Sequence, residues 1–353
     1  MTTAHSNRGS GNKKWKRSRW SDCSKRLIEL LRTYNHLDAE GVKRISFQTM
    51  RERKKILRQG FKYLHEEGGM SLRKPENFAV RHARVLIAHW EQQKLSAATL
   101  QLRFSVFSTF CSWIGKRGML GDIKQYLSDP GVAKRTYVAK EDKSWTSKGI
   151  DVIAKLAEVR LIDPRLAISC MLMYVFGLRV REAVTLQPNV ADQGNTLVVV
   201  KGTKGGRPRE VTIEIEHPWQ RTVLDEAKAF ANKSTGSLIP DTYKRDSWIK
   251  RAYAIAKKCG ISREHGITLH GLRHERANDI YEAITGVKSP VRGGEPVDKQ
   301  LDDHARLVVA EHLGHSRKQI AGAYLGGILR EQPKASWSSN HAQTPAAPQP
   351  ENP

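Results

Sequence analysis

Apolar residues recur every three or four positions through the first third of the chain, which is the spacing of one face of an α-helix. Two of these stripes follow a serine, Ser46 or Ser96, that can cap the N-terminus of a helix. The stripes comprise Phe47, Met50, Leu57, Phe61 and Leu64, and then Leu100, Phe104, Phe107, Cys111 and Ile114. Further helices are expected at 21–34 and 75–93. The pattern therefore predicts an all-α domain over residues 21–126.

The periodicity changes beyond this domain. Residues 127–144 lose it and gain proline, glycine and charge, which is typical of a linker. Residues 145–335 are predicted to form a second, mainly α domain with a small antiparallel β-sheet. Its expected strands are 196–201 and 209–215, joined by the basic turn GTKGGRP, and its expected helices are 147–159, 164–176, 219–232, 243–258, 269–283 and 304–313. The chain ends are predicted to be a flexible basic arm, 1–20, and a disordered tail, 336–353.

The charge of the chain indicates its partner. Lys plus Arg number 60 and Asp plus Glu 36, which gives a net charge of +24 and an isoelectric point near 10.0. Residues 1–60 hold 16 basic and 5 acidic residues, a local excess of 16 − 5 = 11. A basic surface gains free energy by displacing counterions from phosphates, so nucleic acid is the predicted partner.

The composition also predicts a location. No stretch has the roughly 20 consecutive apolar residues of a membrane span, and the basic N-terminus lacks the apolar core of a signal peptide. The 4 cysteines lie far apart and are expected to be reduced thiols. We therefore expect a cytoplasmic protein without membrane contact.

Two segments of the second domain place cations where anions bind. In GLRVRE, Gly177 is expected to end an apolar helix, which puts Arg179 at the start of the next helix. In the predicted hairpin turn, Lys204 lies among further cations, and Lys201 is an alternative to it. Each of these segments alone is weak support for a site.

The segment HGLRH can be interpreted in two ways. Thr268 can cap its helix, and His270 and Arg273 then share one helix face. Alternatively, His270 and His274, four positions apart, could ligate zinc. No glutamate lies between them, and an arginine beside a cation would repel it, so neither a metal nor any other cofactor is expected.

The segment HLGHSRKQIAGAYLGG contains His312, His315 and Tyr324. Ser316 and Gln319 have the spacing of a capping box, which predicts a short helix that ends near Tyr324. We therefore expect this tyrosine on a short, movable element rather than in the core.

In this order, the four segments resemble the active-site motifs of the tyrosine recombinase (phage integrase) family. The spacing from His315 to Tyr324, 324 − 315 = 9 residues, fits the family pattern. The resemblance implies that Tyr324 attacks DNA and forms a 3′-phosphotyrosyl bond, with Arg179, Arg273 and His315 on the phosphate. It also implies site-specific recombination without metal or cofactor.

The resemblance assigns the remaining polar residues as well. His270 would manage the tyrosine proton, and Lys204, or Lys201, would protonate the departing 5′-oxygen. Glu182 would orient Arg179 or cap its helix. His274 and His312 would be supporting or packing residues.

The family further implies an architecture and partners. A SAM-like core-binding domain and a catalytic domain would close on double-stranded DNA as a C-shaped clamp. The protein would act as a homotetramer on the recombination sites of a phage or other mobile element, with accessory DNA-bending proteins, in the nucleoid of a bacterium. Residues 327–337 would be exchanged between subunits. The alternative is a catalytically silent DNA-binding regulator of the same fold.

One region departs from the family pattern. Between Arg273 and His315 lie 315 − 273 − 1 = 41 residues, more than the family usually has. The extra segment, within 285–305, is either a surface loop or a specific contact to DNA or a neighbouring subunit. The surface loop is the favoured interpretation.

Overall fold

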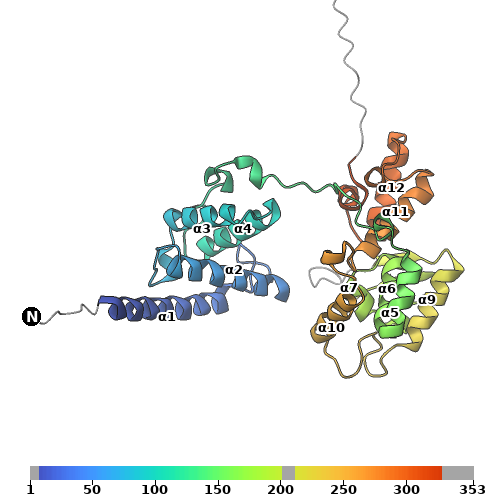
Figure 1. The fold of residues 1–353 in the computed structure, drawn as a ribbon, viewed down its shortest axis with the longest axis horizontal. Coiled ribbons are helices and arrows are strands. Elements are labelled where there is room, and N and C mark those ends of the chain that lie inside the picture. The colour runs from blue at the N-terminus through green and yellow to red at the C-terminus, as the bar shows by residue number, and fades with distance from the viewer. Residues whose placement is uncertain (1–7, 201–210, 328–353) are drawn as a thin grey trace, which may run out of the picture. The chain divides into compact units, whose positions relative to one another are not determined.

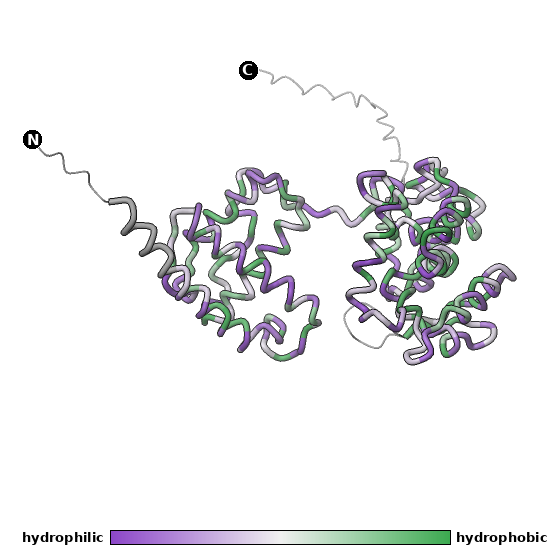
Figure 2. The backbone as a smooth tube through the Cα atoms, turned by 60° about the horizontal axis from the view of Figure 1, so that its bottom comes forward, coloured by the Kyte–Doolittle hydropathy of each residue, from purple (hydrophilic) through white to green (hydrophobic). Residues whose placement is uncertain are grey.

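The computed structural model describes residues 8–200 and 211–327, with side chains from residue 20 onward except at 211. It is mainly α-helical with a two-stranded antiparallel sheet, which confirms the predicted fold class. The chain divides between Tyr137 and Val138 into an N-terminal and a C-terminal unit (Figure 1). Hydrophilic and hydrophobic positions alternate along most of the helices, as amphipathic packing requires (Figure 2).

The N-terminal unit is helical throughout its described part. Its α-helices are α1 (Arg8–Tyr34), α2 (Phe47–Glu66), α3 (Val80–Gln92) and α4 (Ala97–Trp113). Short 3₁₀ turns lie at Pro75–Asn77, Ile123–Gln125 and Pro130–Ala133.

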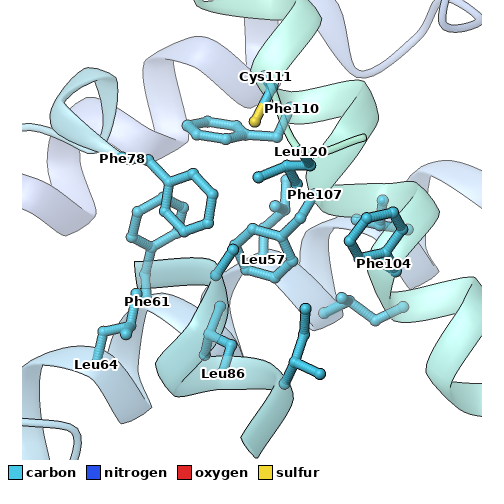
Figure 3. Close-up of a cluster of buried hydrophobic side chains, with 14 of the residues drawn as sticks. Leu57, Phe61, Leu64, Phe78, Leu86, Phe104, Phe107, Phe110, Cys111 and Leu120 are labelled. Atoms are coloured by element: carbon cyan, nitrogen blue, oxygen red, sulfur yellow. The ribbon is translucent and has the colours of Figure 1, made fainter. Parts of the chain in front are cut away.

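Aromatic rings fill the centre of this unit (Figure 3). The ring centroid of Phe61 lies 5.2 Å from that of Phe110 and 5.7 Å from that of Phe78, both in edge-to-face geometry. Gly60 lets Phe107 approach α2 closely, because a Cβ at this position would lie 2.5 Å from Cζ of Phe107. Phe61, Phe104 and Phe107 of the two sequence stripes therefore form part of a core and not a ligand pocket.

The C-terminal unit combines helices with the small sheet. Its strands are β1 (Thr196–Val199) and β2 (Val211–Glu214). Its helices are α5 (Val152–Ile162), α6 (Pro164–Phe176), α7 (Val180–Thr185), α8 (Pro188–Ala191), α9 (Pro218–Ala229), α10 (Arg245–Lys258), α11 (Gly271–Thr285), α12 (Lys299–His312) and α13 (Gly322–Leu325). Its 3₁₀ turns are Thr146–Lys148, Arg263–His265, Pro290–Arg292 and Lys318–Ala321.

The predicted caps Ser46 and Ser96 are confirmed. The Ser46 hydroxyl accepts from the amide of Thr49 at 3.2 Å, and the Ser96 hydroxyl accepts from the amide of Thr99 at 3.4 Å. Such caps satisfy amides that have no partner within the helix. Phe47, predicted to face the core, is instead 71% exposed, because it is the first residue of α2 and lies before the packed turns.

Several predicted boundaries are wrong. The helix expected at 147–159 is Val152–Ile162, and the one expected at 304–313 begins at Lys299. Helix α1 begins at Arg8, so residues 8–20 are helical instead of forming a flexible arm, and the helix expected from residue 21 starts 21 − 8 = 13 residues earlier. Lysine and arginine have high helix propensity, so a helix fixed by the packing of Leu27 continues back through this basic run. The helix expected from residue 75 begins at Val80, after the 3₁₀ turn that starts at Pro75.

The predicted linker is divided between the two units. Leu127 and Ala133 are buried in the core of the N-terminal unit. Ser144, in the C-terminal unit, is fully buried. The proline, glycine and charge of this stretch therefore mark irregular backbone that is mostly exposed and packs on one unit or the other at a few residues.

Candidate active site

Arg179 is placed by the end of an apolar helix. Helix α6 ends at Gly177, whose φ of 64° is the left-handed conformation that glycine adopts without strain. Arg179 is then the N-cap of α7, and its amide donates to Oε2 of Glu182 at 2.7 Å. Its Nη1 donates to Oε1 of the same carboxylate at 2.5 Å. Glu182 therefore both caps α7 and orients the guanidinium.

Arg273, on α11, joins several parts of the unit. It is 1% exposed, and its Nε donates to the hydroxyl of Tyr324 at 3.1 Å. Its Nη1 donates to the carbonyl of Gly177, and its Nη2 donates to the carbonyl of Leu313 at 2.5 Å. Oε2 of Glu182 lies 3.8 Å from Nη1 and compensates part of the buried charge. Arg273 thereby fixes the ends of α6 and α12 relative to the tyrosine.

The start of α11 differs from the prediction. The N-cap is His270, without a side-chain cap, and not Thr268. The chain turns after Thr268. The carbonyl of Thr268 accepts a hydrogen bond from Nε1 of Trp145 at 2.8 Å and another from the amide of Gly271 at 2.9 Å.

Tyr324 lies on a short helix, as predicted, but this position is in the core, so the expectation that it lies outside the core is wrong. It is 6% exposed and belongs to a buried cluster with Leu313, Ala321 and Leu325. The expected capping box is also absent, because the turn Lys318–Ala321 begins without a side-chain cap. Burying the ring and bonding its hydroxyl to an arginine stabilise this position more than a local cap would.

His315 lies between the two arginines. Its Nε2 is 3.3 Å from Nη2 of Arg179 and 3.4 Å from Nη2 of Arg273. A guanidinium can only donate, so Nε2 accepts both bonds and the imidazole proton is on Nδ1. Two guanidinium groups that converge on one acceptor form a site suited to an anion such as phosphate.

The histidines of α11 flank the tyrosine ring. The ring centroid of His274 lies 4.8 Å from that of Tyr324, and that of His270 lies 6.0 Å from it. Desolvation of the imidazole, and then the charges of Arg273, Arg179 and Lys143, lower the pKa of His270 to about 4, although the residue as a whole is exposed to solvent. His270 is therefore neutral near pH 7 and can accept a proton.

Two further histidines, His274 and His312, are expected to be supporting or packing residues. Burial and the neighbouring His270 lower the pKa of His274 to about 3, and its Nδ1 is buried without a hydrogen-bond partner. Burial, Arg276 and Arg273 lower the pKa of His312 to about 3. In the described part of the chain, no group of three or more His, Cys, Asp or Glu side chains could hold a metal ion.

The buried His274 predicts a pH-dependent stability. Its ordinary pKa is 6.5 and its folded pKa is about 3, so between these values the unfolded chain binds a proton that the folded chain excludes. Stability must therefore fall as the pH falls below 6.5. We expect His274→Gln to reduce the slope of unfolding free energy against pH by up to about 1.4 kcal/mol per pH unit between about pH 7 and pH 5. Urea denaturation across this range measures the slope; equal slopes in both proteins would contradict the prediction.

Some predicted residues lie outside the described part of the chain. They are Lys201, Lys204 and the rest of the hairpin turn, together with residues 328–337 of the segment expected to be exchanged between subunits. Conversely, the motifs gave no indication of Lys143, whose charge lowers the pKa of both His270 and His274. In the sequence, Lys143 is simply one basic residue of the predicted linker, and nothing there indicates that it lies near the two histidines.

Comparisons with known proteins identify the family of this chain. Two family models match: Integrase over residues 136–279, and Phage integrase, N-terminal, over residues 35–120. Tyrosine recombinase XerC of Proteus mirabilis is 30% identical over 246 residues, covering 67% of this chain and 73% of that protein. This chain belongs to the tyrosine recombinase family.

Solved structures share the fold of this recombinase. A lambda integrase dimer bound to a COC′ core site superposes with a TM-score of 0.53 at 17% identity, covering 90% of this chain and 99% of that chain. XerH recombinase bound to a palindromic difH substrate superposes with a TM-score of 0.51 at 14% identity, covering 88% and 90%. Among the described helices of the recombinase, none has the length and hydropathy of a membrane-spanning segment.

Proposed function

We propose that this tyrosine recombinase cuts and rejoins duplex DNA at specific sites, with Tyr324 as the nucleophile. The observation that carries the proposal is the convergence of Arg179, Arg273 and His315 beside the tyrosine. Nη2 of each arginine lies within 3.4 Å of the His315 Nε2, and Arg273 also donates to the tyrosine hydroxyl. The proposed nucleophile therefore lies beside the groups proposed to bind its target phosphate.

The chemistry follows from these positions. The Tyr324 oxygen attacks phosphorus and forms the 3′-phosphotyrosyl bond while the bond to the 5′-oxygen breaks. The phenolic proton passes to neutral His270, and the Arg273 guanidinium stabilises the charge that develops on the phenol oxygen. Lys204, or Lys201 as the alternative, would donate a proton to the departing 5′-oxygen; both lie outside the described residues. Attack by a 5′-hydroxyl reverses each step and rejoins the strand.

His315 must change its hydrogen bonding when phosphate binds. Its Nε2 accepts from both arginines in the DNA-free chain. A phosphate oxygen between the guanidinium groups would replace this acceptor, and Nε2 would then have to carry a proton to donate to the phosphate. His315 would do so by changing tautomer or by becoming protonated.

The proposed partners are double-stranded recombination sites and further copies of this chain. A lambda integrase tetramer bound to a Holliday junction superposes with a TM-score of 0.51, covering 87% of this chain and 79% of that chain. We extend this assembly to the present chain as a homotetramer on DNA. Accessory DNA-bending proteins and the origin of the element remain predictions from the family.

The test is covalent capture of DNA without knowledge of the target site. The protein is incubated with a random-sequence duplex library carrying nicks, denatured in detergent, and the DNA that stays attached is sequenced. We expect enrichment of one sequence, a 3′-phosphate linked to Tyr324 in the peptide map, and a released strand that polynucleotide kinase labels without phosphatase treatment. Sequence-specific binding without attachment would instead support the silent regulator.

A further inference from the structure

The segment between Arg273 and His315 contains a turn that is anchored to the active-site helix. The favoured interpretation of the whole segment as a surface loop is wrong for this turn. Ser289 is fully buried, and its hydroxyl donates to Oδ1 of Asn278 on α11. The 3₁₀ turn Pro290–Arg292 follows directly. The turn is partly buried, and Ser289 anchors it to α11.

Arg292 binds carboxylates from two parts of the chain. Its Nη2 donates to Glu275 at 2.6 Å and its Nη1 to Asp279 at 3.2 Å, both on α11. Its Nε donates to Asp142 at 3.2 Å. These carboxylates raise the pKa of the Arg292 guanidinium, whose side chain is 14% exposed. Arg292 therefore connects α11 to the segment around Asp142.

We call that segment, residues 138–146, the strap. Oδ1 of Asp142 accepts from the amide of Ser144 at 2.8 Å and from its hydroxyl at 2.6 Å. The Thr146 hydroxyl donates to Glu275 at 2.6 Å, beside the bond from Arg292. The strap thus lies along the start of α11 and is held there by the same carboxylate as Arg292.

Helix α13, which contains Tyr324, contacts the strap at its start and the turn Pro290–Arg292 at its end. At its start, the amide of Ala139 in the strap donates to the carbonyl of Gly322 at 2.8 Å. At its end, Gly326 has a φ of 83°, and a Cβ there would lie 2.9 Å from the amide nitrogen of Val291. Helix α13 spans only Gly322–Leu325, too short to be stable without such contacts.

We propose that Arg292 is a positioning residue for Tyr324. It ties the strap and the 290–292 turn to α11, and these two segments hold the two ends of α13. Since α11 carries Arg273, this arrangement sets the distance between the tyrosine hydroxyl and the phosphate-binding arginines. The proposal rests on the proposed function, because its consequence for rate needs Tyr324 as the nucleophile.

The test compares Arg292→Met with a matched control, Arg221→Met. Arg221 pairs with the buried Asp192 in the same unit, away from the strap and α13. On a saturating nicked substrate, we expect Arg292→Met to slow covalent attachment on the order of 10²-fold, the cost of misplacing a reacting group by about 1 Å. DNA affinity should stay within about twofold, since the phosphate-binding groups are retained. Hydrogen exchange should accelerate at the amide of Gly326, which donates to Gly322 in the folded chain.

Arg292→Met leaves the carboxylates that Arg292 pairs with unpaired, and this could prevent folding. A second variant tests the proposal without that effect. Ala139→Pro removes the amide that donates to Gly322, at a partly exposed position that carries no charge. It should also accelerate exchange at Gly326 and slow attachment, whereas Arg292→Lys should restore part of the Arg292→Met loss. Exchange at Gly326 no faster in Arg292→Met and Ala139→Pro than in Arg221→Met would overturn the proposal. Because exchange is measured without DNA, this result is independent of whether the protein cuts DNA.

Discussion

Tyr324→Phe is expected to abolish covalent attachment to DNA, reducing its rate by at least about 10⁴-fold, while the protein still folds and binds DNA. The substitution removes only the hydroxyl, and the ring keeps its contacts with Leu313, Ala321 and Leu325. The lost bond is the one that Arg273 donates at 3.1 Å, and that guanidinium keeps its two carbonyl partners. The fold therefore loses little, whereas the chemistry loses its nucleophile.

The measurement is the yield of detergent-resistant protein–DNA complex on a nicked substrate, with DNA affinity measured in parallel. Tyr126→Phe is the matched control, because the Tyr126 hydroxyl also donates one bond, to the carbonyl of Leu120 at 2.8 Å. We expect this control to attach DNA at the normal rate. A Tyr324→Phe protein that still forms the complex would refute the assignment of the nucleophile.

The parts of the fold that sequence predicts well are those set by local chemistry. The caps Ser46 and Ser96 and the left-handed Gly177 each satisfy a requirement of the backbone within a few residues. The same applies to Glu182, which is three residues after Arg179 and reaches back to its amide. Such features depend little on the rest of the molecule, so a short segment contains the information.

The burial of Tyr324 could not be predicted in this way. It depends on Arg273, 51 positions earlier in the chain, and on Leu313 at the end of α12. The role of Arg292 is hidden for the same reason, since its partner Asp142 is 150 positions away. A residue in a glycine- and proline-rich segment resembles a loop residue until its distant partners are known.

The two arginines of the site are expected to respond differently to the same substitution. Arg273 is buried and donates to two main-chain carbonyls and the tyrosine, so it has a structural role as well as a chemical one. The Arg179 side chain is 20% exposed and pairs with Glu182 alone among carboxylates in the described chain. Lysine keeps the positive charge in either case but loses the planar fork.

Arg179→Lys and Arg273→Lys should each slow covalent attachment by on the order of 10²–10³-fold, because each removes a donor that would stabilise the charge on the phosphoryl oxygens. Only Arg273→Lys should also lower the free energy of unfolding substantially, by about 2–4 kcal/mol, since it leaves buried carbonyls without donors. For Arg179→Lys we expect a loss of about 1 kcal/mol, as for a partly exposed ion pair. Single-turnover attachment and urea denaturation measure the two effects separately. If the rate of attachment fell only in proportion to the loss of stability in both variants, the arginines would support the fold without binding the phosphate. The cluster around His315 would then be structural.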